Sequence, residues 1–302
     1  MEIRHLETFL SVAKLLSFNR AAEKLHYAQS SISAQIQSLE KDLGVQLFDR
    51  LGRGIRLTEA GDRLLQYAEK ITDLAEETRS EIGSIKAPRG SLTIRIPETL
   101  GVYRLPPVIT RFRSAFPNVQ LRFTTCTHDG LQKDLRKGIT DLAFLLTESI
   151  HAADMEVETL GFESIVMVSS PAHPFASRKR VRTSDLEGET VLLSRVDCSY
   201  RKIFENILEK EGVGFDTSMI FHSVEALKRC VMENAGITIL PHVSVADDVS
   251  RGKLVPLKWE EGTIEAALLM IWYKERWVSP SLEAFMEMAR EYLKESYSQS
   301  PP

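Results

Sequence analysis

The sequence predicts a multidomain α+β protein with a helical N-terminal part and a longer α/β part. Three observations lead to this expectation. Up to residue 86, apolar residues recur at the spacing of three and four that is typical of helices. Beyond residue 90, short β-branched runs alternate with helical patterns. Finally, a chain of 302 residues is longer than one hydrophobic core requires.

Three short helices are expected before residue 45. Their apolar positions are Leu6, Phe9, Leu10, Ala13 and Leu16, then Ala21, Ala22 and Leu25, then Ile32, Ile36, Leu39 and Leu43. The Ser17 hydroxyl is placed to cap the second helix. Gly44 is placed to end the third, because glycine adopts the left-handed conformation that closes many helices.

The third helix has an unusual solvent side, because it carries Ser and Gln where most surface helices carry Lys and Glu. The residues off its apolar face are Gln29, Ser30, Ser31, Ser33, Ala34, Gln35 and Gln37. Short or neutral hydrogen-bonding groups of this kind can pair with base edges in a major groove. A merely solvated polar face is the alternative, and we favour base contact because an arginine-bearing hairpin follows.

That hairpin, a wing, is predicted from two short strands, Val45 to Phe48 and Ile55 to Leu57, around a glycine-containing turn. A long acidic helix should then run from an N-cap at Thr58 to about Lys86. Its narrow apolar stripe consists of Ala60, Leu64, Ala68, Ile71, Ala75, Ile82 and Ile85. A single helix cannot bury such a stripe, so we expect a homodimer with two reading helices. The segment 87–90 should break the helix between domains.

The α/β part is expected to contain strands and helices in alternation. The predicted strands are 92–96, 119–125, 141–146, 164–169, 190–194, 218–221, 236–240, 254–257 and 265–273, and the predicted helices are 99–115, 129–137, 199–211, 224–233 and 280–296. No Gly-x-Ser-x-Gly elbow, phosphate-binding Walker loop or Gly-x-Gly-x-x-Gly fingerprint accompanies these elements. An enzyme is therefore not expected.

Composition narrows the class of protein further. Net charge is −4, yet residues 1–58 hold eight Lys or Arg against six Asp or Glu, so positive charge is local. The longest apolar run, Ala266 to Tyr273, is too short to cross a bilayer, and the N-terminus lacks a secretory pattern, which predicts a cytoplasmic protein. Cys126, Cys198 and Cys230 are too scattered for a disulfide framework. The seven histidines include no i, i+4 pair, so we expect neither a metal nor another cofactor.

The N-terminal motif resembles the LysR-type transcriptional regulators. The matching positions are Leu6, Phe9, Ser17, Phe18, Ala21, Ala22, Leu25, Gln29, Ser30, Ser33, Gln35, Ile36, Leu39, Glu40, Leu43, Gly44, Leu47, Phe48, Arg50, Arg53, Leu57, Thr58, Ala60 and Gly61. Phe116-Pro117 and the stretch from Gly236 to Pro241 look like the sensor region of that family. Ala34 departs from the pattern, since many members carry Arg there, which puts the target DNA sequence in doubt but not the class.

This resemblance implies a winged helix-turn-helix in residues 1–58, a linker and dimerisation helix in 59–87, and an effector-binding domain in 88–302. The effector-binding domain should be built like a periplasmic binding protein, with subdomain I in 91–162 and 267–302 and subdomain II in 163–266. Promoter DNA, a small-molecule effector and RNA polymerase would be the partners, and dimers would assemble into a homotetramer. The expected DNA contacts are Ser17, Arg20, Ala28, Gln29, Ser30, Ser31, Ser33, Gln35, Gln37, Arg50, Arg53 and Arg56.

The effector should bind between the subdomains, where helix N-termini present unpaired N–H groups. The candidate residues are Glu98, Thr99 and Leu100, then Cys198, Ser199, Tyr200 and Arg201, with Thr127, Thr147 and Ser223 as weaker candidates. Arg201 either clamps an anionic effector or pairs with Glu205 one turn along, and the sequence favours neither.

For two further residues, Arg50 and Cys198, a purely structural role is the alternative to a functional one. Arg50 contacts phosphate or forms an ion pair with Asp49 or Glu40, whereas the wing tip should hold Arg53 free for phosphate. Cys198 invites a redox role, but no resolving thiol is predicted nearby, so a packing role is favoured. A solute-binding protein for transport would explain the α/β part but not residues 1–86. Ligand-gated transcription control is therefore the preferred function.

Overall fold

The computed structural model describes residues 1–51, 54–82, 90–125, 130–147, 152–194, 198–214, 219–262 and 264–298. Backbone contacts divide the chain into two compact units. Unit 1 comprises Met1–Ser91 with Asn118–Gln120, and unit 2 comprises Leu92–Pro117 with Leu121–Pro302. No helix in the described part of the chain is long and apolar enough to cross a bilayer.

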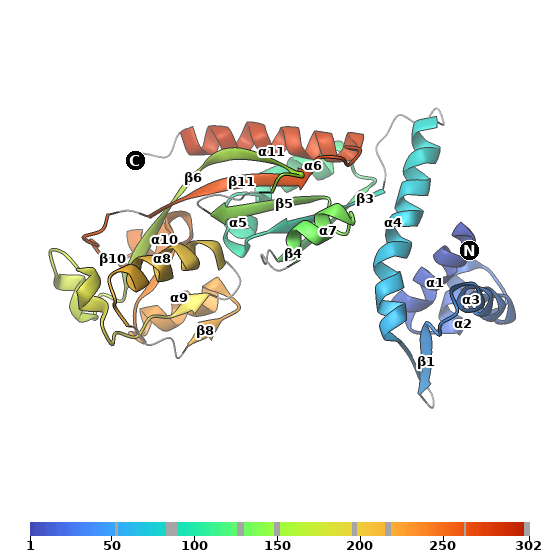
Figure 1. The fold of residues 1–302 in the computed structure, drawn as a ribbon, viewed down its shortest axis with the longest axis horizontal. Coiled ribbons are helices and arrows are strands. Elements are labelled where there is room, and N and C mark those ends of the chain that lie inside the picture. Colours follow the sequence, from blue (N-terminus) through green and yellow to red (C-terminus); the bar gives the residue numbers. More distant parts are fainter. Residues whose placement is uncertain are drawn as a thin grey trace. The chain divides into compact units, whose positions relative to one another are not determined.

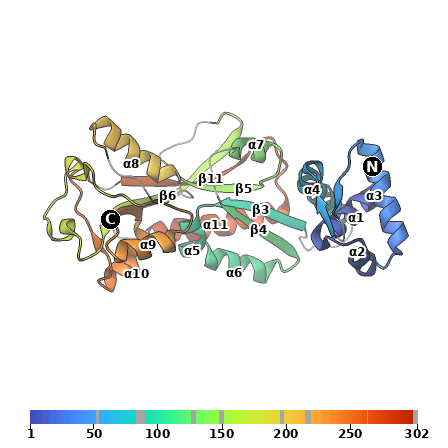
Figure 2. The same ribbon diagram turned by 90° about the horizontal axis from the view of Figure 1, so that it is seen from below.

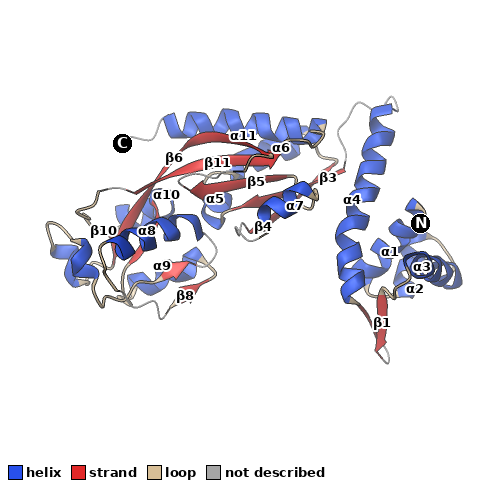
Figure 3. Cartoon of the chain, viewed as in Figure 1, coloured by secondary structure: helices blue, strands red, loops and turns tan. Residues whose placement is uncertain are grey.

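Unit 1 consists of helices and one small hairpin (Figure 1, Figure 3). Its elements are α1 (Ile3–Leu15), α2 (Phe18–Leu25), α3 (Gln29–Leu43), β1 (Phe48–Leu51), β2 (Gly54–Leu57) and α4 (Glu59–Ile82). The two strands pair antiparallel, with Phe48 opposite Leu57. This is the winged helix-turn-helix followed by a long helix that the sequence predicts, although the first strand begins at Phe48, later than expected.

The ends of these helices confirm the local chemistry predicted for them. The Ser17 Oγ accepts the backbone N–H of Arg20 at 3.3 Å and so caps α2. Gly44 follows α3 with φ +70°, in the left-handed region. The Thr58 Oγ1 accepts the N–H of Gly61 at 3.0 Å and donates to the Gln46 carbonyl at 2.7 Å, which caps α4 and fixes it to the segment before the wing.

The apolar stripe of α4 is only partly as expected. Ala68 is fully buried against the core of unit 1, and Ala60 and Leu64 pack against the same core. This half of the stripe therefore needs no second copy of the chain, because α1 already covers it. Ile71 and Leu74 remain 36% and 55% exposed, and they form the part of the helix that is open to a partner.

The described residues of unit 2 form an α/β structure with one large sheet and a separate small sheet, in which β7 and β8 pair in parallel (Figure 1). Its strands are β3 (Gly90–Ile96), β4 (Val119–Thr125), β5 (Leu142–Thr147), β6 (Met155–Ser169), β7 (Leu193–Ser194), β8 (Ile220–Phe221), β9 (Thr238–Pro241), β10 (Val255–Pro256) and β11 (Ile264–Tyr273). Its helices are α5 (Glu98–Tyr103), α6 (Pro106–Ala115), α7 (Leu131–Arg136), α8 (Cys198–Lys210), α9 (Val224–Met232), α10 (His242–Ser250) and α11 (Pro280–Ser298), with 3-10 turns at Pro174–Ser177 and Thr183–Leu186.

Two long strands, β6 and β11, lie side by side in the larger sheet. The order of this sheet is β10-β6-β11-β5-β3-β4, with β9 also paired to β6. Along β6 the partner changes at Ile165, which lies opposite both Ile264 of β11 and Pro241 of β9. The strands and helices on one side of this change form a first subdomain, containing β3–β5, α5–α7 and α11. Those on the other side form a second, containing β7–β10 and α8–α10. The strands β6 and β11 thus cross between the two subdomains that the resemblance implies.

The sheet of the first subdomain is covered on both faces. Leu131 and Leu135 of α7 pack on one face with Ala143 and Leu145 of β5. The alternate residues of β5 are buried as well, and Figure 2 shows α6 and α11 across the opposite face. Phe112 of α6 and Phe285 of α11 meet there with ring centroids 5.3 Å apart. Burial on both faces explains why β5 is apolar at successive positions rather than at alternate ones.

Five elements of unit 2 differ from the sequence-based expectation. The helix predicted over 99–115 is two helices, because Pro106 and Pro107 lack the N–H groups that would continue the first one. The strand predicted over 164–169 begins at Met155, in a stretch that contains three glutamates and Gly161. The helix α10 was not predicted at all. The predicted strands 190–194 and 218–221 are reduced to two-residue strands.

Replacing Gly61 with alanine should destabilise unit 1. A Cβ at this position would lie 2.2 Å from the Leu47 carbonyl oxygen, a backbone atom that cannot move aside cheaply. Alanine gains about 1 kcal/mol over glycine in a helix, but overpacking of this kind costs about 1–3 kcal/mol. We expect Gly61→Ala to lower the melting temperature of the full chain measured by circular dichroism. Gly214→Ala is the control, since its Cβ would meet only a Glu187 carboxylate oxygen at 3.4 Å. Equal melting temperatures for the two variants would contradict this prediction.

Candidate DNA-reading face and effector site

Helix α3 presents a polar face opposite a fully apolar one. Ile32, Ile36 and Leu39 are at most 2% exposed and belong to the core that α1, α2 and α4 share. On the other side, Gln29, Ser30, Ala34 and Gln37 are exposed, while Ser31, Ser33 and Gln35 are half-buried. Packing therefore fixes the rotation of α3 about its axis, and that rotation brings the uncharged polar residues to the surface.

Two of these residues are held in place by each other. The Gln29 Nε2 donates to the Ser33 Oγ at 2.8 Å, one turn along the exposed face. The pairing orients the Gln29 amide while its oxygen remains an acceptor toward solvent. A Gln amide that is already oriented loses less side-chain entropy when it pairs with an adenine edge. Gln29 and Ser33 therefore form a preorganised unit on the reading face.

Gln35 has a structural contact that the sequence did not indicate. Its Oε1 accepts the hydroxyl of Thr8, which is buried in α1, at 2.6 Å. This hydrogen bond ties α3 to α1 and uses one of the two acceptor positions of the Gln35 amide oxygen. A threonine beside the apolar stripe of α1 was the only signal in the sequence for this contact.

The wing is fixed to α3 by carboxylates. The Glu40 Oε1 accepts the backbone N–H groups of Leu47 and Phe48 at 2.8 and 3.4 Å. Across the hairpin, the Arg56 guanidinium pairs with Asp49, with N–O distances of 3.1 and 3.2 Å. Both acidic residues considered as partners of Arg50 thus have other partners. Arg56 has a partner within the wing, and its role at DNA stays a prediction.

The other predicted DNA contacts belong to the wing and to the region around α2. Arg50 lies in β1, but its side chain is not among those described, and Arg53 lies outside the described residues. Ser17 is half-buried at the start of α2, and Arg20 and Ala28 are exposed. Their role at DNA stays a prediction.

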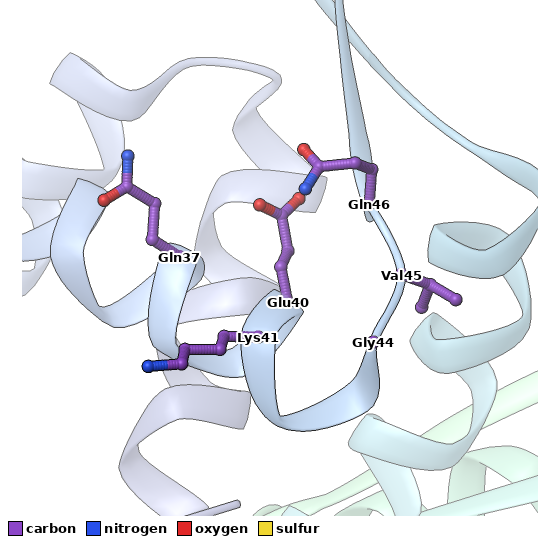
Figure 4. Close-up of a pocket in the computed structure, with 6 residues that line it drawn as sticks. All are labelled: Gln37, Glu40, Lys41, Gly44, Val45 and Gln46. Atoms are coloured by element: carbon purple, nitrogen blue, oxygen red, sulfur yellow. The ribbon is translucent and has the colours of Figure 1, made fainter.

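A shallow polar depression of about 360 Å³ lies at the C-terminal end of α3. Figure 4 shows its lining residues, which are Gln37, Glu40, Lys41, Gly44, Val45 and Gln46, with the Glu40 and Gln46 side chains turned toward each other. Because Glu40 already binds the wing backbone, this depression belongs to the junction of helix and hairpin. It contains none of the predicted effector residues.

The predicted effector residues lie at the starts of three helices of unit 2. Glu98, Thr99 and Leu100 form the first turn of α5, directly after β3, and Thr99 and Leu100 are buried. Tyr200 is buried and Arg201 half-buried in the first turn of α8. Thr147 ends β5, half-buried and opposite Ala267. Cys198 and Ser199 open α8, but their side chains are not described, and Thr127 lies outside the described residues.

The structure joins two of these helix starts directly. The Ser223 Oγ caps α9 by accepting the N–H of Ala226 at 3.4 Å. Both carboxylate oxygens of Glu98 lie 3.2–3.3 Å from the backbone nitrogen of Val224 in the same turn. A carboxylate is favoured there by the partial positive charge of a helix N-terminus. Glu98 of the first subdomain therefore contacts the second subdomain beside Ser223.

Arg201 pairs with Glu205, one of the two alternatives considered, with an Nε–Oε1 distance of 2.8 Å. Cys230 is a free, half-buried thiol that packs in the core of the second subdomain. Within the described residues, no three His, Cys, Asp or Glu side chains gather as a metal site would require.

Four charged or polar residues of unit 2 escaped the sequence-based search. Lys228 is only 4% exposed and hydrogen-bonds to Tyr103 of the first subdomain at 3.2 Å. Glu163 of β6 is equally buried and accepts the Arg104 guanidinium at 3.1 Å. Their partners lie 125 and 59 residues away along the chain, so no local pattern could reveal them.

Comparison with known proteins gives matches along the whole chain. Residues 3–62 match the family described as bacterial regulatory helix-turn-helix protein, lysR family, and residues 86–294 match the LysR substrate binding domain. The uncharacterized HTH-type transcriptional regulator YwqM of Bacillus subtilis is 38% identical over 97% of this chain and 100% of its own. The transcriptional regulator GltR of the same organism is 33% identical over 97% of each. The crystal structure of CbnR, a LysR family transcriptional regulator, is 25% identical, with a TM-score of 0.68 over 97% of this chain and 100% of that one.

Removal of the Gln29 amide should reduce discrimination between DNA sequences rather than overall affinity. A good side-chain pair to a base edge is worth about 1–3 kcal/mol against the wrong base. We expect Gln29→Ala to bring the affinities for the specific and a scrambled duplex closer together by that amount in fluorescence anisotropy titrations. Gln46→Ala, an exposed glutamine beyond the end of α3, should leave the ratio unchanged. Equal weakening of Gln29→Ala on both duplexes would rule out a base contact.

Proposed function

The chain belongs to the LysR family of transcriptional regulators, and we propose that a small-molecule effector bound between its two α/β subdomains controls how its winged helix-turn-helix engages promoter DNA. Effector binding would shift the relative populations of two arrangements of the subdomains. The protein carries out no chemistry in this proposal. It acts as a switch whose two inputs are DNA and a metabolite.

One observation carries the DNA-binding half of the proposal. The face of α3 opposite the core exposes Gln29, Ser30 and Gln37 and no charged residue before Lys41 except the half-buried Glu40. A helix whose solvent side is neutral and hydrogen-bonding is suited to base edges, while the nearby arginines supply affinity for phosphate. The reading residues we propose are Gln29, Ser30, Ser31, Ser33 and Gln37, with Ser17, Arg20, Ala28, Arg50 and Arg53 positioning the domain. Gln35 and Arg56 have mainly structural roles.

The effector site we propose centres on Glu98, Thr99 and Ser223, since these come from both subdomains and lie near one contact. The first turn of α8 and the end of β5 complete it, with Ser199, Arg201 and Thr147. An anionic effector would have to face Glu98 and separate Arg201 from Glu205. These charges favour an effector that is neutral or offers hydrogen-bond donors.

The assembly we propose is a homodimer through α4, and a homotetramer formed from two such dimers. Exposed Ile71 and Leu74 support the dimer, because the other half of the stripe is already covered. A symmetric dimer presents two α3 helices to two half-sites of an operator. We further propose contact with RNA polymerase and action in the cytoplasm, where promoter DNA is found.

Binding of the DNA upstream of the gene tests the proposal. Purified full-length protein should retard this fragment in a gel-shift assay in the presence of excess random DNA. If an equal mass of random DNA abolishes this retardation, sequence-specific regulation is refuted.

The two wing arginines should differ in their contribution to DNA affinity. Arg53→Ala should weaken binding on all sequences and reduce the slope of log K against log salt by about one unit, because one phosphate contact is lost. Arg56→Ala should change the slope less, because the Asp49 carboxylate already neutralises that guanidinium. Salt titrations of both variants on one duplex measure this. Equal slopes for Arg53→Ala and the wild type would remove the phosphate contact from Arg53.

The effector site can be tested by a thermal-shift screen of small metabolites on the full chain. A ligand that binds only the folded state raises its stability by mass action, by about 2.7 kcal/mol at a concentration of one hundred Kd. Thr99→Val and Ser199→Ala should abolish the shift caused by a hit while the affinity for upstream DNA is retained. If both variants keep the full shift, the site lies elsewhere.

A further inference from the structure

The short helix α5 connects the two subdomains through three polar contacts. Glu98 at its start accepts the Val224 N–H of α9. Tyr103 at its end accepts the Lys228 ammonium of the same helix. Arg104, which follows directly, binds Glu163 of the crossing strand β6. We call these three residues and their partners the α5 clamp.

The Arg104 contact is the fixed end of the clamp. Glu163 accepts the Arg104 guanidinium at 3.1 Å, the Tyr297 hydroxyl at 2.9 Å and, through its other oxygen, the Val243 N–H of α10 at 3.3 Å. The guanidinium also lies 4.6 Å from the centroid of the Tyr297 ring. Burial and the charge of Glu163 together raise the pKa of the Tyr297 hydroxyl, so it stays a donor. A buried carboxylate with three donors does not release them easily.

The Tyr103 contact is a second link between the subdomains, and the Tyr103 side chain that accepts this hydrogen bond is uncharged. Burial alone would lower the pKa of the Lys228 ammonium, but hydrogen bonds to Asp248, Glu225 and Tyr103 outweigh burial and raise it. Asp248 accepts this ammonium at 2.8 Å and the Ser244 carbonyl accepts it at 3.0 Å, both within the second subdomain. Lys228 therefore keeps its charge partner when Tyr103 moves away.

Glu98 differs from both, because its carboxylate is half-buried and its partner among the described residues is a single backbone N–H. It also lies where residues of the proposed effector site meet, next to Thr99 and opposite Ser223. An effector that enters between these residues has to displace the Glu98 carboxylate or bind it. The weakest contact of the clamp and the effector site thus coincide.

We propose that Glu98 is the release point of the α5 clamp: its carboxylate holds the two subdomains in the arrangement that the structure shows, and loss of the Val224 contact switches the regulator. This inference rests on the proposed function and adds the contact through which regulation operates. It makes this arrangement of the subdomains an actively held state.

Residue-resolved hydrogen exchange of the full-length protein tests the contact without any effector. Glu98→Ala should accelerate exchange of the Val224 amide by about tenfold or more, because its acceptor is lost. The Val243 amide, held by Glu163, should be unaffected. Glu98→Gln keeps an acceptor oxygen but no charge, so an intermediate rate is expected. The control is Glu283→Gln, an exposed carboxylate in the first turn of α11.

DNA binding by the same variants tests the switch. With no small molecule added, Glu98→Ala should change the Kd for the upstream duplex by about threefold or more, while Glu283→Gln leaves it unchanged. Faster exchange at Val224 with an unaltered Kd would overturn the switch but leave the proposed function intact. Unchanged exchange would overturn the clamp itself. A wild-type protein with no preference for the upstream duplex would instead overturn the proposed function, and the inference with it.

Discussion

The arrangement of unit 2 depends on the backbone pairing between β6 and β11. Residues 267–271 of β11 are paired on both sides, with β5 and β6, whereas Ile264 to Ala266 pair with β6 alone. From Ile165 onward β6 pairs with β9 instead. Two adjacent strands thus belong to both subdomains, and their hydrogen bonds have to survive any change between them. The rearrangement that we propose would therefore have to keep this strand pair intact.

The helix ends and the reading face of unit 1 could be predicted because their causes are local. Ser17 and Thr58 each accept a backbone N–H three residues on, Gly44 adopts the left-handed conformation at the end of α3, and the face of α3 follows from helical periodicity. The sequence did not indicate which of the predicted DNA contacts also have partners within the fold. Gln35 contacts Thr8, 27 residues away, and Arg56 is paired across the hairpin. Such partners are set by packing, so the polar residues of one helix can serve either DNA or the fold.

In unit 2, by contrast, the contacts at the proposed site join residues that are far apart in the sequence. The sequence indicated which helix starts carry candidate effector residues, but not that Glu98 and Ser223 would meet, since Glu98 binds a backbone group 126 residues away. The first half of β6 was missed for a related reason. Its Gly161 is weak in strands, yet a side chain there would collide with the ring of Tyr297, so the glycine allows the last turn of α11 to lie against the strand. The low strand propensity of Gly161 is thus offset by its close packing against Tyr297, which is distant in the sequence.

Helix α5 carries residues of the proposed effector site and also contacts α9 of the second subdomain. Ligand binding and the rearrangement of the subdomains can therefore be coupled over a short distance within unit 2. Coupling between distant sites requires an element with two arrangements that both sites bias. Here Thr99 and Glu98 are in the first turn of α5, and Tyr103 and Arg104 are at its end, only one to two turns away. Because Arg104 is fixed at the crossing strand, displacement of the first turn changes the orientation of α5 relative to α9. A single six-residue helix thereby relates occupancy of the proposed site to the arrangement of the two subdomains.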